Sequence, residues 1–170
     1  NCVTYQEVFP YIMNNDIWLG NGMGRWISGF LVPESYELYG TEARIEDGQR
    51  IVATNNCLWL TNLDHGRRHN PMKLMTMADN IKFSKHKRIR EEKYIRYDNY
   101  DAIDVPFSDS IPSDYDGIMG VPISFLDKYN PDQFEIVGEA NHGSDNEFDL
   151  FKPLINGKAK FKRILIRRKK

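Results

Sequence analysis

The chain opens with a polar and apolar pattern typical of a helix start. Thr4 can cap a helix, and Glu7 follows three residues later as the partner of a capping box. A proline in a helix interior removes a backbone donor and clashes with the preceding turn. We therefore predict a helix from Thr4 to about Asn14 that Pro10 kinks or confines to short turns.

Short apolar and aromatic runs follow, separated by glycine-rich or polar stretches. Three of these runs predict strands, at residues 17–19, 26–32 and 51–61. The stretches between them, residues 20–24 and 34–50, predict loops, and the Glu-Asp-Gly at 46–48 predicts a turn. The N-terminal third of the chain is therefore expected to be mainly strand and loop.

Charged and proline-rich segments dominate the middle of the chain. Residues 64–82 are interpreted as a connector, and residues 84–96 predict a charged helix. Residues 98–122 hold three prolines and little periodicity, which predicts an ordered irregular stretch. The remaining predictions are a short helix, a strand and an exposed acidic loop, at residues 124–129, 134–138 and 139–149.

The clearest local signal lies near the C-terminus. Asn156-Gly157 stands between residues 154–155 and the strand-like residues 158–167, a pattern that predicts a β-hairpin. Strands at both ends of the chain with helices between them predict an α/β fold with a mixed sheet. A length of 170 residues and 41% hydrophobic residues are those of one globular domain.

Composition narrows the setting of the protein. No apolar run approaches the roughly 18 residues of a membrane span, and no signal-peptide pattern opens the chain, so no membrane partner is expected. Cys2 and Cys57 form no metal-type pair, and two scattered thiols favour the cytoplasm. Because the first residue is Asn1 rather than Met, we expect a fragment of a longer protein.

The net charge of −1 conceals a strong separation of charge along the chain. Residues 98–149 carry thirteen acidic side chains and one lysine, whereas residues 82–96 carry seven basic side chains and residues 156–170 carry eight. Clustered basic residues are the footprint of a surface that binds phosphate. An equally open interpretation is that these cations pair with the acidic residues inside the fold.

Three local motifs suggest chemistry that their context does not support. The glycines of residues 20–24 lead into a strand pattern, whereas a phosphate-binding loop leads into a helix. His65 and His69 have the spacing of zinc ligands, but no third ligand is evident, and Arg67 and Arg68 between them suit phosphate better. Glu91-Glu92-Lys93 resembles part of a nuclease site, but a solvated helix face explains it better. We therefore expect no metal site.

The segment 93–100 (KYIRYDNY) has the residue types of a DNA contact. Its basic side chains can neutralise phosphates, Asn99 can bind adenine through two hydrogen bonds, and tyrosines can stack on unpaired bases. Taken alone, this pattern is a weak signal, and core packing is the default interpretation of the tyrosines.

Several runs together resemble the EcoRI-type adenine-specific DNA methyltransferases, and only the C-terminal part of that family. The runs are residues 59–69 (WLTNLDHGRRH), 93–103 (KYIRYDNYDAI), 114–122 (DYDGIMGVP) and 125–134 (FLDKYNPDQF). The resemblance implies transfer of a methyl group from S-adenosylmethionine to adenine in double-stranded DNA. It also implies the C-terminal half of a Rossmann-like methyltransferase fold at residues 1–63, with an appended target-recognition region at residues 64–170.

The family's catalytic motif, Asn-Pro-Pro-Phe, is not found in this sequence. Its Asn side chain directs the adenine amine at the methyl donor, and its aromatic residue stacks on the flipped base. Asn70-Pro71 and Asn130-Pro131 lack the second proline and the aromatic residue, so both are interpreted as turns. The resemblance therefore places no catalytic residue here. Two alternatives stay open: the motif and the donor loop lie in an N-terminal part of the same protein, or the chain is a degenerate relative of the family.

The resemblance and the charge pattern together nominate the site residues. Asn1 and Thr4 match positions just past the strand that follows the catalytic motif in the family, and the resemblance nominates them as the border of the flipped adenine. The candidates for DNA contact are Arg67, Arg68, Lys85, Lys87, Arg88, Arg90, Lys93, Arg96 and Asn99. Two other functions stay open: a stand-alone sequence-specific DNA-binding module and a nuclease-associated domain.

Overall fold

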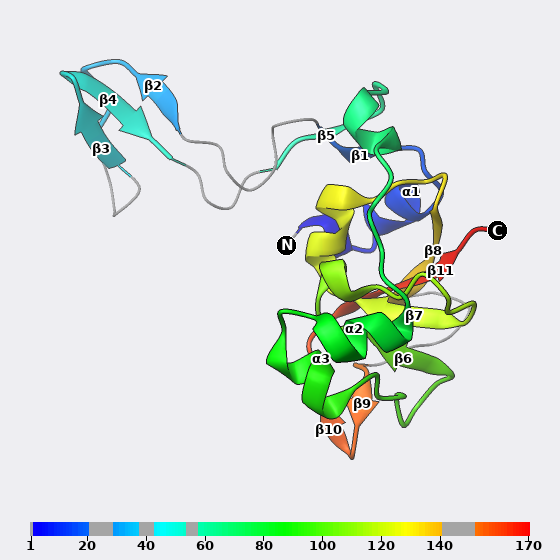
Figure 1. Cartoon of the computed structure of the whole chain (residues 1–170). Helices are drawn as coiled ribbons and strands as arrows, with labels where there is room; N and C mark the ends of the chain where they lie inside the picture. The colour runs from blue at the N-terminus through cyan, green and yellow to red at the C-terminus, as the bar shows by residue number, and fades with distance from the viewer. Residues whose placement is uncertain (1, 21–28, 38–42, 54–57, 141–151) are drawn as a thin grey trace.

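A computed structural model describes residues 2–20, 29–37, 43–53, 58–140 and 152–170 (Figure 1). Three short α-helices are present in these ranges: α1 (Phe9–Met13), α2 (Met77–Phe83) and α3 (Lys87–Glu92). Four 3-10 turns accompany them: η1 (Cys2–Thr4), η2 (Gly66–His69), η3 (Ser108–Ser110) and η4 (Ile123–Lys128). The rest of the regular structure is strand, and the predicted α/β class is confirmed.

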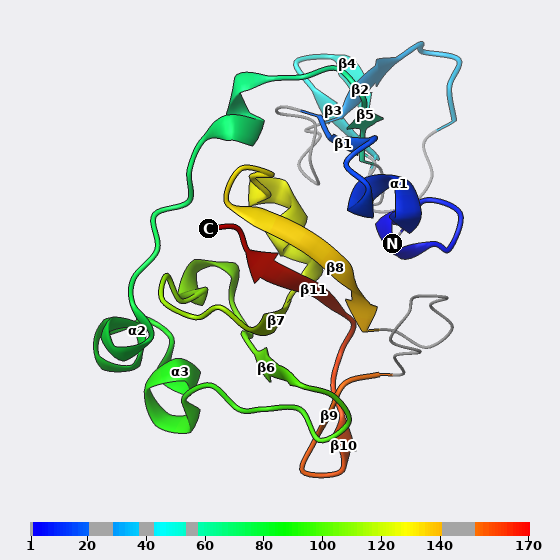
Figure 2. The same cartoon turned by 90° about the vertical axis from the view of Figure 1, so that its right-hand side faces the viewer.

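The main sheet is formed by β6 (Ala102–Asp104), β7 (Ile118–Val121), β8 (Phe134–Ala140) and β11 (Arg163–Arg168). The strand order is β6-β7-β11-β8. β6 and β7 pair in parallel, whereas β11 runs antiparallel to both β7 and β8, and β8 lies beside β11 in Figure 2. The sheet is therefore mixed, as the sequence predicted.

The core lies on this sheet and draws on both ends of the chain. Residues 163–166 at the start of β11 are all buried, because the strand is covered on both faces. Phe125 of η4 meets Phe134 of β8 edge to face, with 5.5 Å between ring centroids. Val3 and Phe9 belong to the same buried cluster as these aromatic residues. Residues of 1–63 and of 64–170 thus share one core.

The first helix is shorter than predicted. α1 begins at Phe9 rather than at Thr4, and Cys2–Thr4 forms the separate turn η1. Pro10 occupies the first turn of α1, where its missing N–H costs no hydrogen bond. The proline therefore sets the start of the helix, and the prediction that Thr4 caps it is wrong.

The basic middle segment contains two helices where one was predicted. α2 lies in the supposed connector and is capped by Thr76, whose hydroxyl accepts a hydrogen bond from Asp79 N at 3.1 Å. α3 ends at Glu92, because Lys93 adopts a positive φ of 59° that cannot continue a helix. The prediction of one helix over residues 84–96 is therefore too long, and the connector prediction is wrong for residues 77–82.

The prediction that residues 98–122 are irregular is also wrong. They contain β6 and β7, two of the four strands of the main sheet. Their strands of three and four residues are almost entirely buried, so they show no alternation of polar and apolar side chains. The predicted helix at 124–129 appears as the 3-10 turn η4, and the strand predicted at 134–138 is confirmed as β8.

A three-stranded sheet stands apart from the rest of the described chain in Figure 1. We call it the arm: β2 (Phe30–Val32), β3 (Ala43–Glu46) and β4 (Gln49–Val52), in the order β2-β4-β3. The turn predicted at 46–48 is confirmed, since Asp47 and Gly48 both have positive φ between β3 and β4. The loop prediction for residues 34–50 is wrong where β3 and β4 form.

The other N-terminal predictions are met in part. β1 (Trp18–Leu19) pairs antiparallel with β5 (Leu60–Thr61), so the strand predicted at 17–19 is confirmed. The strand predicted over residues 51–61 is instead divided between β4 and β5, which belong to different sheets. Parts of several predictions fall on residues outside the described ranges. They are the loops at 20–24 and 34–50, the strands at 26–32 and 51–61, and the acidic loop at 139–149.

The C-terminal hairpin forms at the predicted turn. β9 (Leu154–Ile155) pairs with β10 (Lys158–Ala159) across Asn156 and Gly157, whose φ angles are 52° and 69°. These angles match the left-handed turn that Asn-Gly favours. The hairpin is shorter than predicted, because residues 163–168 leave it to form β11 in the main sheet.

Candidate nucleic-acid interface

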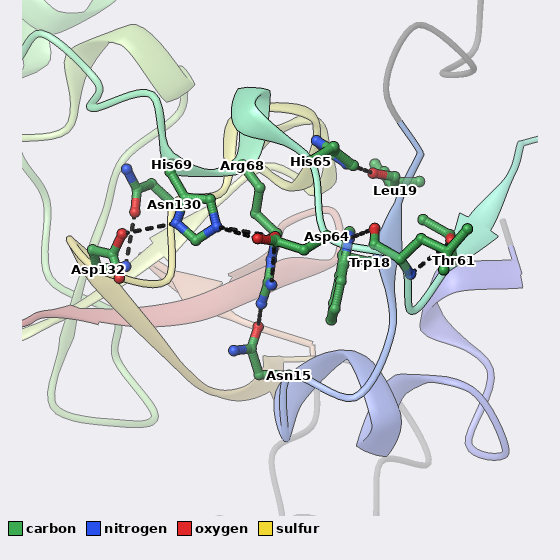
Figure 3. Close-up of polar contacts among 11 residues, drawn as sticks. Asn15, Trp18, Leu19, Thr61, Asp64, His65, Arg68, His69, Asn130 and Asp132 are labelled. Carbon is green, nitrogen blue, oxygen red and sulfur yellow. Dashed lines mark hydrogen bonds and ion pairs between the residues drawn. The ribbon is translucent and has the colours of Figure 1, made fainter.

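The segment from Asp64 to His69 follows β5, and its side chains point in different directions (Figure 3). It comprises Asp64, His65 and the 3-10 turn η2. A tight turn separates neighbouring side chains, so the two arginines and two histidines of this segment meet different surroundings. The four side chains therefore make separate contacts.

Arg68 is held inside the fold. It is 8% exposed, and its guanidinium group lies over the Trp18 ring, 3.5 Å from the ring centroid. Its Nη2 donates to the Asn15 side chain, and its Nη1 lies 3.5 Å from Asp64 Oδ1. Arg68 thus ties η2 to β1 and to the end of α1. Its charge is used within the protein.

Arg67 has the opposite environment. Its side chain is exposed, and no acidic side chain of the described residues lies within ion-pair distance of it. Of these two adjacent arginines, one is held inside the fold and the other is exposed to solvent. The sequence alone could not separate the two.

His69 lies between two carboxylates. Its Nδ1 is 3.0 Å from Asp132 Oδ2, and its Nε2 is 2.9 Å from Asp64 Oδ1 (Figure 3). A carboxylate only accepts hydrogen bonds, so both contacts are hydrogen bonds when the ring carries a proton on each nitrogen. Hydrogen bonds to Asp132 and then Asp64 raise the pKa of His69, and its hydrogen bond lowers the pKa of Asp64.

His65 faces away from this arrangement. Its Nε2 is 2.9 Å from the carbonyl oxygen of Leu19 in β1, so it anchors η2 to the small β1–β5 sheet. The two histidines with zinc-like spacing therefore make separate contacts. Within the described ranges, no group of three or more His, Cys, Asp or Glu is arranged to hold a metal ion.

The basic residues around α3 are paired with acidic neighbours to different degrees. Lys85 Nζ lies 2.7 Å from Asp109, and Lys87 Nζ lies 3.5 Å from Glu91, in pairs whose lysines are about three-quarters exposed. Arg96 pairs with the exposed Asp101. Exposed pairs of this kind contribute little stability, so a phosphate can replace the carboxylate at small cost.

Asp109 is a partial exception among these surface pairs. Burial opposes ionisation of its carboxyl, but hydrogen bonds from Lys85 and His86 outweigh it and lower the pKa of Asp109. His86 also stacks on Phe107, with 3.6 Å between ring centroids. The turn before α3 is therefore fixed to η3.

Arg88 belongs to a buried network instead. Its Nη2 donates to Asp104 Oδ2 at 3.1 Å, and Arg163 Nε and Tyr97 Oη donate to Asp104 Oδ1 at 2.9 Å and 2.8 Å. Asp104 is 2% exposed. A buried carboxylate needs such partners, because an unpaired buried charge is very costly. The sequence did not single out Asp104, because this residue ends a strand within the stretch that was predicted to be irregular.

The remaining nominated residues have mixed roles. Arg90 is exposed but donates to the carbonyl oxygen of Ser84. Lys93 is exposed just after α3. Asn99 donates to Lys152 O at 3.2 Å and accepts from Leu154 N at 3.1 Å, so it holds the C-terminal hairpin in place. The side-chain amide of Asn99 is therefore occupied by the backbone of the hairpin.

The nuclease-like motif lies on α3. Glu91 pairs with Lys87, and Glu92 pairs with Arg88 Nε at 2.9 Å, each one helical turn away. These are the contacts of a solvated helix face. Nothing in this arrangement favours a nuclease-associated domain.

The two residues nominated for the adenine pocket can be placed only in part. Asn1 lies outside the described residues. Thr4 is buried, and its hydroxyl accepts a hydrogen bond from Lys162 Nζ at 3.1 Å. The contact joins the turn η1 to the segment just before β11, a neighbour that sequence analysis did not identify.

Two sequence features considered for cofactor or base binding, the glycine-rich loop and Asn130-Pro131, make local contacts where they are described. Of the glycine-rich loop 20–24 only Gly20 is described, and its N–H donates to the carbonyl oxygen of Trp59. Asn130 is buried, and its Oδ1 accepts from Asp132 N at 2.7 Å in a turn. It therefore stabilises the chain locally and is not available to a base. No helix among the described residues has the length and apolar character needed to cross a membrane.

Comparisons with known proteins concern the whole chain. The family model described as adenine-specific methyltransferase EcoRI matches residues 1–169. The type II methyltransferase M.EcoRI of Escherichia coli is 52% identical over 171 residues, which are 100% of this chain and 48% of that protein. The chain thus spans about half the length of this relative.

Two mycoplasma proteins are more distant relatives. The type II methyltransferase M.MgeORF184P of Mycoplasma genitalium is 36% identical over 138 residues, which are 79% of this chain and 40% of that protein. The type II methyltransferase M.MpnI of Mycoplasma pneumoniae is 32% identical over the same shares of the two chains. No solved structure matches the chain.

Proposed function

The chain belongs to the EcoRI family of adenine-specific methyltransferases, and on that premise we propose that it is the DNA-recognising C-terminal part of a site-specific DNA adenine methyltransferase. The observation that carries this proposal is the match along the whole chain to one half of such an enzyme. The full-length enzyme would use S-adenosylmethionine and act on double-stranded DNA in a restriction-modification system.

The donor site and the catalytic motif belong, in this proposal, to another part of the full-length enzyme. The support is that neither Asn-Pro pair of this chain has the catalytic sequence, and Asn130 is engaged in a turn. Residues 1–63 would complete the catalytic fold, and residues 64–170 would carry recognition. The N-terminal part of the same protein would then be the partner of this chain.

The DNA surface proposed here is narrower than the set nominated from sequence. Arg67 and Lys93 are exposed and have no acidic partner among the described residues, and Lys85, Lys87 and Arg96 are held only by exposed ion pairs. Arg90 is exposed and can add to this set. Arg68, Arg88 and Asn99 would act indirectly, by holding this surface in shape.

The adjacent arginines of η2 provide the sharpest test. We expect Arg67→Ala to weaken binding to a mixed-sequence duplex of about 30 base pairs, with an unchanged melting temperature. A phosphate contact contributes about 0.9 to the slope of log affinity against log salt, so the slope should fall by about that amount. We expect Arg68→Ala to lower the melting temperature, because it removes the group that Asn15 and Trp18 contact.

Two outcomes would contradict the proposal. The first is no salt-dependent DNA binding by the unaltered chain. The second is methyl transfer from labelled S-adenosylmethionine to duplex DNA by this chain alone, which would mean that the donor site is within it. A stand-alone DNA-binding module predicts the same binding but no gain of methyl transfer when the N-terminal part is supplied.

A further inference from the structure

We propose that residues 158–162, which we call the strap, form a second DNA contact in which Phe161 stacks on an unpaired base. The strap comprises β10 and the three residues that lead into β11. The inference rests on the proposed function and adds a recognition element outside the nominated residues. It assigns base stacking to Phe161 and phosphate contact to Lys158 and Lys160.

The first observation is the exposure of Phe161. Its side chain is 88% exposed, more than that of any other large hydrophobic residue among those described. Exposing an aromatic ring forfeits the burial that usually stabilises a fold, although single exposed apolar residues do occur. The exposure of one ring is therefore not by itself the mark of a binding site.

The charge around Phe161 supplies that evidence. Lys160 and Lys162 flank it directly, Lys158 lies three residues earlier, and residues 156–170 contain no acidic side chain. Neither Lys158 nor Lys160 has an acidic partner among the described residues, whereas Lys162 donates to Thr4. An aromatic ring between unpaired cations is the combination that binds bases together with their phosphates.

The strap is also held firmly in place. Lys160 N donates to Pro153 O at 2.8 Å, which fixes the strap against the other side of the hairpin. Gly157 N donates to Asp98 Oδ2 at 2.7 Å, and Asn99 adds two bonds to the backbone at residues 152 and 154. Asp98 is the acidic group beside the turn, and its Oδ2 is occupied by this amide. A preorganised element binds at a lower entropic cost than a mobile one.

The position of the strap relates it to the proposed reaction. An enzyme that modifies the amine of adenine must take the base out of the helical stack, which leaves unpaired bases at the site. Lys162 contacts Thr4, which the family resemblance places at the border of the adenine pocket. Phe161 immediately precedes Lys162 in the chain, so the strap backbone that carries the ring is one residue from the side chain that contacts this border.

The test uses the whole 170-residue chain and two duplexes of about 30 base pairs, one fully paired and one with a central A·A mismatch. We expect the unaltered chain to prefer the mismatched duplex. Phe161→Ala should reduce that preference by roughly 5- to 100-fold, the range expected for one base–aromatic stack. Phe161→Trp should retain it. The double variant with Lys158→Ala and Lys160→Ala should lower the slope of log affinity against log salt by about 1.8 on both duplexes, because two phosphate contacts are removed.

Matched controls come from other surfaces of the chain. Ile45→Ala removes an apolar side chain that is 63% exposed on the arm, and Lys128→Ala removes an exposed lysine of η4. Figures 1 and 2 both show η4 (yellow) far from β9 and β10. Neither control should change the preference for the mismatch or the salt slope.

The outcomes separate this inference from the proposed function. Tight, salt-dependent binding that neither Phe161→Ala nor the double lysine variant alters would overturn the strap and leave the proposed function standing. Failure of the unaltered chain to bind either duplex would overturn both. Equal losses from Phe161→Ala and Ile45→Ala would show a general effect of surface apolar residues and would also reject the strap.

Discussion

The ammonium group of Lys162 donates a hydrogen bond to the hydroxyl of Thr4, with 3.1 Å between Nζ and Oγ1. The two residues are 158 positions apart, so this contact joins the two ends of the chain. Thr4 is buried among core residues that include Val3, and Lys162 precedes the buried start of β11. This contact therefore links the strap to the turn η1, so a substitution in one of them should affect the conformational stability of the other.

We expect Lys162→Met to lower the free energy of unfolding by about 1.5–3 kcal/mol, the range for a hydrogen bond to a charged group. Methionine keeps most of the aliphatic length, so the change reports mainly on the lost bond to Thr4. Lys160→Met is the matched control, because the side chain of Lys160 has no such partner among the described residues. Urea unfolding of both variants checks the prediction, and equal losses would contradict it.

The network around Asp104 predicts a larger effect. Asp104→Asn leaves the guanidinium groups of Arg88 and Arg163 without their buried counter-charge. Breaking a buried ion pair by removing one partner costs about 3–5 kcal/mol. Asp101→Asn removes a carboxylate that is 86% exposed, so it should cost at most about 1 kcal/mol. Chemical denaturation of the two variants gives the comparison, and similar losses would show that the network is not stabilising.

The sequence predicted those parts of the fold that local residue patterns determine. Asn156-Gly157 specified its hairpin, because both positions adopt the positive φ that this pair tolerates. Asp47-Gly48 did the same in the arm. The strands β6 and β7 were missed because they are only three and four residues long and buried. Their conformation depends on non-local pairing, of β6 with β7 and of β7 with β11.

The site shows the same division between local and non-local causes. The charge pattern identified the basic region around α3 correctly as a cluster, but it could not tell which cations are paired. Arg67 and Arg68 are identical in type and adjacent in sequence, and only the distant Trp18 and Asn15 decide that Arg68 is internal. Asp104 gave no signal, since its partners come from three separate segments.

The hairpin turn allows a test of backbone strain. Gly157 has a φ of 69°, a region that side chains with a Cβ rarely adopt, and no atom lies within 4 Å of a Cβ built there. Gly157→Ala should therefore destabilise through conformation alone, by about 1–2 kcal/mol. Gly66→Ala is the control, because that site is equally open and its φ is not positive. Thermal unfolding should show a loss only at residue 157, and a loss at both sites would contradict the prediction.

The paired carboxylates around His69 make a prediction about pH. Hydrogen bonds to Asp132 and Asp64 raise the pKa of His69 above its usual 6.5, so the protonated ring persists at a higher pH in the folded chain. Stability that comes from a raised pKa is fully present below the unfolded value of about 6.5. It is lost as pH rises through the folded value.

Nuclear magnetic resonance of the imidazole protons measures this pKa directly. We expect Asp132→Asn to lower the pKa of His69, because it replaces a charged acceptor 3.0 Å from Nδ1 with a neutral amide. Asp47→Asn in the arm is the control and should leave it unchanged. If His69 titrates at or below 6.5 in the unaltered chain, the imidazole is not held in its protonated form by these carboxylates. Protonation of His69 would then contribute no stability to the contact between η2 and the turn at Asp132.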